Sequence, residues 1–142
     1  MGSVYFTEKM LPFLRKNKNS RIINLSSLWA FASPKKTIYP NIEMGPSLVY
    51  SISKSGLTNY TKYLCERESK YNIIVNSLVP GWFPRKGKKE NKKYINSIIS
   101  NIPSKRIGKL EDIITSASFL LMNGSKYFNG QILVLDGGYS IY

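Results

Sequence analysis

The chain has 142 residues, of which 42% are hydrophobic and 13% aromatic, so it amounts to one domain with enough apolar side chains for a packed core. It contains one cysteine and no histidine, which excludes an internal disulfide framework, His-based catalytic triads and the usual zinc sites. The net charge of +13 is compatible with nucleic acid, an acidic membrane surface or a phosphorylated substrate as a partner, and by itself it selects none of them.

Neither a membrane-spanning nor a secretory segment is predicted. The longest apolar runs, such as residues 73–75 and 132–135, are far too short to cross a bilayer. Glu8 and Lys9 lie where a signal peptide would be apolar, which argues against secretion. The single cysteine, Cys65, suits a reducing compartment and is interpreted as a small core residue rather than a nucleophile. A cytoplasmic protein is therefore expected.

Helical and strand-like segments alternate along the chain. The first half predicts a helix over residues 3–18, which Pro12 could interrupt, then a strand over Arg21–Leu25, a long loop over 26–47 and the best helix over 48–70. The second half predicts a strand over residues 73–79, a basic loop over 82–89, a weak helix over 90–102, a helix over 110–122 and a strand over 131–135.

Such alternation is typical of a parallel sheet with crossover helices. Ligands of these sheets bind beyond the carboxyl ends of the strands. The residues that follow the three predicted strands are Ser26 and Ser27, Pro80 and Gly81, and the run 136–138. We expect these segments to lie on one edge, where Asp136 and the glycines after it form the turn at a strand end rather than a metal or phosphate loop.

Tyr50 and Lys54 are four residues apart at the start of the long predicted helix, so both side chains project from one face. An ammonium near a phenol stabilises the phenolate, and such a phenol can exchange a proton with a substrate oxygen. Ser27, at the end of the first strand, could donate a hydrogen bond to the same oxygen. The pair alone also occurs on ordinary helix faces, so the spacing by itself does not decide between the two interpretations.

Six blocks in a fixed order give this pair its context. They are RIINLSS at 21–27, YSISKSG at 50–56, VNSLVPG at 75–81, RIG at 106–108, EDI at 111–113 and GQILVLDGG at 130–138. Together they resemble the C-terminal half of the short-chain dehydrogenase/reductase family. The resemblance implies an α/β fold, a Rossmann-like doubly wound parallel sheet that is truncated at its N-terminal side to about three strands with flanking helices, over residues 1–142.

The resemblance also implies roles for individual residues. Tyr50 would be the catalytic acid and base, Lys54 would hold the nicotinamide ribose, and Ser27 would polarise the substrate. Pro80, Gly81 and Phe83 would contact the nicotinamide end of NAD or NADP, between which the sequence does not discriminate. The chain would then belong to an NAD(P)-dependent oxidoreductase that transfers hydride at a carbonyl or alcohol carbon, with no metal. Arg85 departs from the family, which often has a hydroxyl residue there.

The larger departure is at the front of the chain. The ten glycines include no Gly-x-x-x-Gly-x-Gly loop of the kind that cradles the cofactor pyrophosphate. The chain is therefore expected to be a half-domain, with Arg21–Leu25 as an open strand edge and little activity on its own. The alternative is a non-catalytic remnant or an interaction partner of a full-length relative. Besides a small-molecule substrate, the expected partner is either a second copy of the chain or such a relative.

Two other segments bear on the substrate. The stretch between Ser27 and Tyr50 is longer than is usual in the family and resembles a branch from bacterial surface-polysaccharide and flagellar-glycan synthesis, which implies a sugar or nucleotide-sugar substrate. The basic run at residues 85–93 is interpreted as a solvated charge run, in preference to a lid for phosphorylated substrates. Binding of nucleic acid ranks last, because the sequence contains no recognisable nucleic-acid-binding module, and Trp82 and Phe83 precede the basic run instead of interleaving with it.

Overall fold

The computed structural model describes residues 2–39, 46–84 and 91–141. Its helices are α1 (Gly2–Leu14), α2 (Leu48–Glu68), α3 (Lys92–Ser100) and α4 (Leu110–Leu121), and its strands are β1 (Arg21–Leu25), β2 (Ile74–Pro80) and β3 (Ile132–Leu135). Short 3-10 turns are η1 (Leu28–Ala30), η3 (Ser69–Tyr71), η4 (Asn123–Ser125) and η5 (Tyr139–Ile141). Each predicted helix and strand is present, so the predicted order of elements is confirmed.

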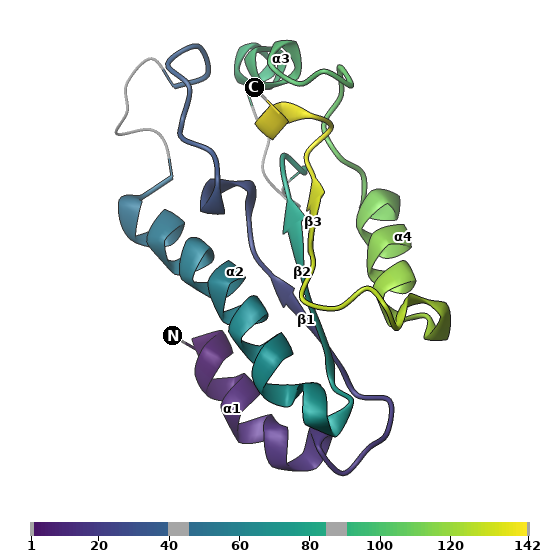
Figure 1. Cartoon of the computed structure of the whole chain (residues 1–142). Helices are drawn as coiled ribbons and strands as arrows, with labels where there is room; N and C mark the ends of the chain where they lie inside the picture. Colours follow the sequence, from purple (N-terminus) through teal and green to yellow (C-terminus); the bar gives the residue numbers. More distant parts are fainter. Residues whose placement is uncertain (1, 40–45, 85–90, 142) are drawn as a thin grey trace.

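Within the described residues, the strands form one parallel sheet in the order β1-β2-β3. Helices α1 and α2 lie on one side of the sheet and α4 on the other (Figure 1). Neighbouring residues of β1 show the two faces, because Ile22 packs toward α1 and α2 while Arg21 Nη1 donates to the Leu120 carbonyl of α4. This three-layer arrangement confirms the predicted α/β fold.

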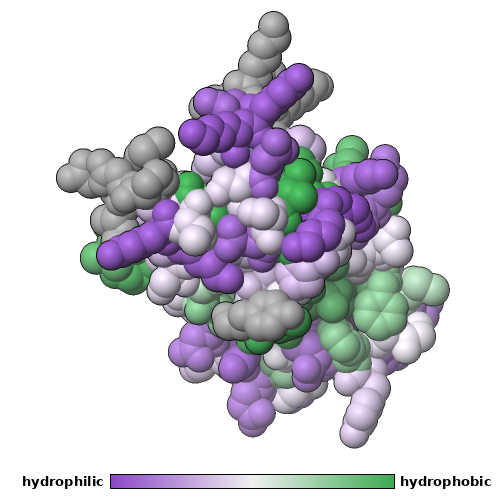
Figure 2. Space-filling view, turned by 90° about the horizontal axis from the view of Figure 1, so that it is seen from above, coloured by the Kyte–Doolittle hydropathy of each residue, from purple (hydrophilic) through white to green (hydrophobic). Residues whose placement is uncertain are grey.

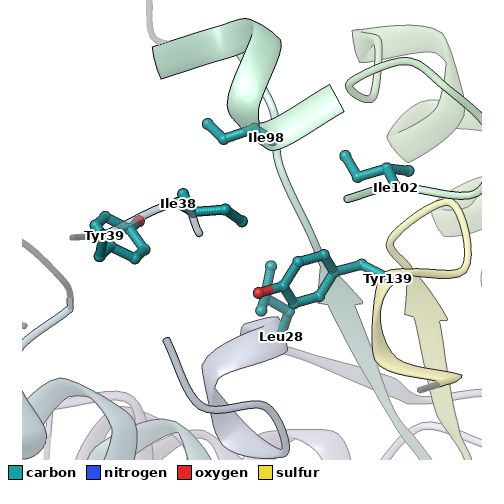
Figure 3. Close-up of a cluster of buried hydrophobic side chains, with 6 residues drawn as sticks. All are labelled: Leu28, Ile38, Tyr39, Ile98, Ile102 and Tyr139. Carbon is teal, nitrogen blue, oxygen red and sulfur yellow. The ribbon is translucent and has the colours of Figure 1, made fainter. Parts of the chain in front are cut away.

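Two buried clusters hold the layers together. The first joins α1 and α2 to β2 through Leu11, Leu64, Ile73 and Val75, with Cys65 packed against it. Cys65 is partly buried and packs against apolar side chains, as expected of a small core residue, and burial raises the pKa of its thiol. The second cluster lies beyond the carboxyl ends of the strands and brings α3, η1 and η5 together; its members are Leu28, Ile38, Tyr39, Ile98, Ile102 and Tyr139 (Figure 3).

Helix α1 ends at Leu14, earlier than the end of the helix predicted over residues 3–18. Pro12 does not break α1, which continues to Leu14 because a proline near the end removes a single backbone hydrogen bond. The apolar side chains at helical spacing along α1 do not form a buried face. Instead Tyr5, Phe6 and Phe13 are exposed, and the buried residues of α1 are Thr7 and Leu11.

Viewed from above, at the end where α3 and the C-terminus lie, the surface is largely hydrophilic (Figure 2). Hydrophobic side chains gather at the lower right, the side on which α4 lies in Figure 1. Arg85 and most of the basic run at 85–93 lie outside the described residues. None of the described helices is long and apolar enough to span a membrane.

Candidate active site

A groove of about 750 Å³ opens beyond the carboxyl ends of β1 and β2, and α2 forms one of its walls. All six residues predicted for the site line it: Ser27, Tyr50, Lys54, Pro80, Gly81 and Phe83. They come from three segments that are far apart in the sequence, and the parallel sheet brings them together. No acidic side chain is among the described residues that line the groove, so Lys54 is its one charged group there.

The first two turns of α2 present Tyr50 and Lys54. Ser47 caps the helix by accepting a hydrogen bond from the Tyr50 amide at 3.2 Å, which fixes where the helix begins. The Tyr50 side chain is 42% exposed. Lys54 Nζ lies 5.7 Å from the centroid of the Tyr50 ring and donates to the Leu25 carbonyl at 2.7 Å, so the ammonium is held between the phenol and the end of β1.

The two serines after β1 have different environments. Ser26 is buried and donates to the Lys54 carbonyl at 2.9 Å, and its hydroxyl also pairs with that of Thr58 at 2.9 Å, so it fastens the end of β1 to α2. Ser27 Oγ accepts a long hydrogen bond from the Trp29 amide, at 3.4 Å. Among the described residues the Ser27 hydroxyl hydrogen has no acceptor, which leaves it able to donate to a ligand in the groove.

The end of β2 at Pro80 and the following Gly81 are fixed by their neighbours. The Gly81 amide donates to the Leu135 carbonyl at 2.8 Å, and a Cβ at Gly81 would lie 2.7 Å from the Asp136 Cα, so only glycine fits. Gly108 makes room for Phe83 in the same way, since a Cβ there would lie 2.3 Å from the Phe83 ring. Both contacts place the residues that follow β2 against the groove.

The third predicted strand end lies outside this groove. Asp136 and Gly137 line a smaller adjacent pocket of about 140 Å³, which shares Trp82 and Phe83 with the main groove. The Asp136 carboxylate accepts from the amides of Gly138 at 2.9 Å and Ser140 at 2.8 Å. With φ of 65° at Gly137 and 90° at Gly138, the segment is a glycine turn, as predicted.

Sequence reasoning missed the aromatic wall of the groove, which consists of Trp29, Tyr39, Trp82 and Tyr94. The rings of Trp29 and Trp82 meet edge to face at 5.6 Å, and the hydroxyls of Tyr39 and Tyr94 lie 3.0 Å apart. The position of the two tryptophans, a few residues beyond the ends of β1 and β2, was the available signal. Tyr39 and Tyr94 carried no such signal in the sequence, because they reach the groove only through the packing of the loop that contains Tyr39 and of α3, which contains Tyr94.

The chain as a whole is similar to known proteins. The family model described as enoyl-(acyl carrier protein) reductase matches residues 1–140. The chain is 32% identical over 142 residues to post-translational flagellin modification protein A of Campylobacter coli, covering 99% of this chain and 54% of that protein. It is 32% identical over 145 residues to 7alpha-hydroxysteroid dehydrogenase of Paraclostridium sordellii, covering 99% and 51%.

A solved structure gives the same result at the level of the fold. The NAD+-bound short-chain dehydrogenase of Leptospira borgpetersenii superposes with a TM-score of 0.87 at 27% identity, covering 98% of this chain and 52% of that one. The chain thus spans about half the length of the relatives it matches. On the family match, the relatives and the fold together, the chain belongs to the short-chain dehydrogenase/reductase family.

Proposed function

We propose that the groove is the catalytic half of an NAD(P)-dependent oxidoreductase that interconverts a carbonyl and an alcohol. The observation that carries the proposal is the convergence of Ser27, Tyr50 and Lys54 on one groove together with the turn that follows β2. The groove offers an ammonium, hydroxyls and no carboxylate among its described residues, a donor set that fits the ribose hydroxyls and the nicotinamide end of the cofactor.

Each side chain has a task in the reductive direction. Tyr50 gives its hydroxyl proton to the substrate oxygen, and Ser27 holds that oxygen with a hydrogen bond. Lys54 binds the ribose hydroxyls with the donors that its contact with the Leu25 carbonyl leaves free. Bound NADH or NADPH supplies the hydride to the carbonyl carbon. In the oxidative direction Tyr50 takes the proton back from the alcohol.

A sugar or nucleotide sugar is the substrate class that we propose for this groove. Its aromatic wall gives a sugar ring an apolar surface on which to pack, and the hydroxyls of Tyr39, Tyr94 and Ser27 offer polar partners at the edges. The similarity to a flagellin modification protein points the same way. The lone cysteine fits a reducing compartment, and we place the reaction in the cytoplasm.

The catalytic proposal is tested in a fusion that supplies the rest of the domain. The part of the Campylobacter coli relative outside the matched region is joined in front of the full chain, and NADH and NADPH oxidation is followed with a nucleotide-linked keto sugar and with cyclohexanone. Tyr50→Phe should lower kcat by at least about 100-fold, because it removes the transferable proton. Tyr127→Phe, at a fully exposed ring, is the matched control and should leave kcat unchanged.

Equal turnover of the Tyr50→Phe and parent fusions would contradict the assigned role. The first experiment is a titration of the chain alone with NADH and with NADPH, in which cofactor fluorescence reports binding. Micromolar saturation would support cofactor binding by this chain itself. Absence of binding up to millimolar cofactor would favour the second candidate function, a non-catalytic partner of a full-length relative. The exposed apolar residues at the start of α2 offer a contact surface for such a partner; they are Leu48, Val49 and Ile52.

A further inference from the structure

The amino ends of β1 and β2 lie at the end of the sheet away from α3 and the C-terminus (Figure 1). A pocket of about 260 Å³ opens there. Its walls come from the turn before β1, the turn between η3 and β2, and the segment between η4 and β3. It shares no lining residue with the candidate active site, which lies beyond the carboxyl ends of the same strands.

Positive charge dominates this pocket, which we call the basic pocket because Lys18, Arg21 and Lys126 line it. No carboxylate is among the described residues that line it, and none of the three cations forms an ion pair with a described carboxylate. The carboxyl ends of α2 and α4 lie close by, since Ser69 lines the pocket and Arg21 donates to the Leu120 carbonyl at 3.5 Å. Each helix end is worth about half a negative charge, so the two ends offset about one of the three cations and leave an excess of about +2.

Several N–H groups around the basic pocket are left to donate hydrogen bonds. Arg21 Nη1 donates to Ser125 Oγ at 3.4 Å, which holds the guanidinium while its Nε and Nη2 have no acceptor among the described residues. Asn129 Oδ1 accepts from the Val75 amide at 2.8 Å, so its side-chain nitrogen is the end that can bind a ligand. Two further side-chain amides line the pocket, those of Asn19 and Asn72. Cations and N–H donors without a carboxylate are the groups that bind oxyanions.

Volume and charge together select the class of anion. A water molecule occupies about 30 Å³ in the liquid, so the pocket has room for a phosphate group with a small organic part attached. A phosphate monoester carries about two negative charges above its second pKa of about 6, which matches the excess of about +2. The phosphates of a nucleic-acid backbone carry one charge each and match it less well.

We propose that the basic pocket binds the phosphate group of a small phosphate monoester. The phosphate lies between Lys18, Arg21 and Lys126 and accepts hydrogen bonds from the asparagine side chains. This site goes beyond the proposed oxidoreductase function and does not depend on it, because the basic pocket and the groove lie at opposite ends of the strands.

The test is an NMR titration of the full, isotope-labelled chain with glycerol 3-phosphate at about pH 7.5, where the ester is a dianion. The amide signals of Asn19, Asn72 and Lys126 should shift and saturate with a Kd of about 1 mM or lower. The amide signals of Tyr50 and Lys54 should stay in place, because these residues lie in the groove. Glycerol, which lacks the phosphate, should shift none of these signals.

Lysine substitutions separate the basic pocket from the overall charge of +13. Lys18→Gln and Lys126→Gln each remove one cation at an exposed position of the pocket, and each should raise the Kd by about 5-fold or more, the value of one charge pair about 4 Å apart in water. Lys62→Gln is the matched control, since it removes the same charge from an exposed position of α2 outside the pocket, and it should leave the Kd unchanged.

Four results would overturn the proposal. The first is a lack of saturation up to about 10 mM glycerol 3-phosphate. The second is an equal loss of affinity in the Lys62→Gln control, which would show an effect of overall charge. The third is a shift at Tyr50 and Lys54 in place of the pocket residues, which would put the anion in the groove. The fourth is displacement of glycerol 3-phosphate from the pocket by a short DNA duplex at a lower phosphate concentration, which would identify a surface for phosphodiesters.

Discussion

Replacing Glu68 by Gln should destabilise the fold by about 3 kcal/mol, because its carboxylate is the buried centre of an ionic network between α1 and α2. The Glu68 side chain is 0% exposed. Arg15 donates to it twice, at 2.7 and 2.8 Å, and Arg67 Nε donates at 2.7 Å. Arg67 also donates to Glu8 of α1, at 2.8 Å. The Glu68 carboxylate therefore accepts three hydrogen bonds from two guanidinium groups, and all three involve one charge.

The magnitude follows from burial and from the number of bonds. Removing one partner of a buried ion pair costs about 3–5 kcal/mol. The side chains of Arg15 and Arg67 are 34% and 30% exposed, so water can hydrate both guanidinium groups in the variant, and the lower end of that range applies. In a chain of this length a loss of about 3 kcal/mol lowers Tm by about 10 °C.

Urea and thermal unfolding, followed by far-UV circular dichroism, measure this loss. Glu66→Gln is the matched control, because Glu66 is exposed two residues earlier in the same helix, and it should change stability by less than about 0.5 kcal/mol. A loss below about 1 kcal/mol for Glu68→Gln at pH 7 would refute the reasoning, since it would mean that the network behaves like an exposed one.

The same network predicts a dependence on pH. Hydrogen bonds from Arg15, and then from Arg67, hold the pKa of Glu68 below its usual value. A lowered folded-state pKa gives stability that is fully present above the unfolded value of about 4.3 and is lost as the pH falls through the folded value. The difference in stability between the parent chain and Glu68→Gln should therefore shrink as the pH falls below about 4. A difference that stays constant under acid would contradict the assignment.

Three other substitutions test the packing around the site. The Tyr139 hydroxyl is buried without a hydrogen-bond partner among the described residues, and burial raises its pKa. Tyr139→Phe should therefore leave the stability measured by thermal unfolding unchanged or raise it by up to about 1 kcal/mol. A loss of more than about 1 kcal/mol would show that the hydroxyl has a partner. Gly56→Ala, in an open helical position of α2, should raise stability by about 0.5–1 kcal/mol. Gly81→Ala should lower stability by about 2 kcal/mol or more, because the new Cβ would clash with the backbone of Asp136. If urea unfolding showed the Gly81 variant to be more stable than the Gly56 variant, that contact would be contradicted.

Local pattern determined the order and type of the elements. The apolar run of Arg21–Leu25 predicted β1 with its observed bounds, and the stripe through Leu57 and Leu64 predicted α2, since period and burial are properties of neighbouring residues. The rule that parallel strands gather ligands at their carboxyl ends then located Ser27 and Gly81 on one groove. The roles of these residues in catalysis stay predictions.

Tertiary structure alone decided which side chains share a surface. Ile52 of α2 and Phe6 of α1 are apolar residues of predicted helices and yet are exposed, because burial depends on what packs against a helix and not on its period. Tyr39 and Tyr94 join the aromatic wall from positions 55 residues apart, and the buried charge of Glu68 is paired with Arg15, which lies just after α1 and 53 residues away in the sequence. Contacts between distant segments depend on how the chain packs in three dimensions, which no local period encodes.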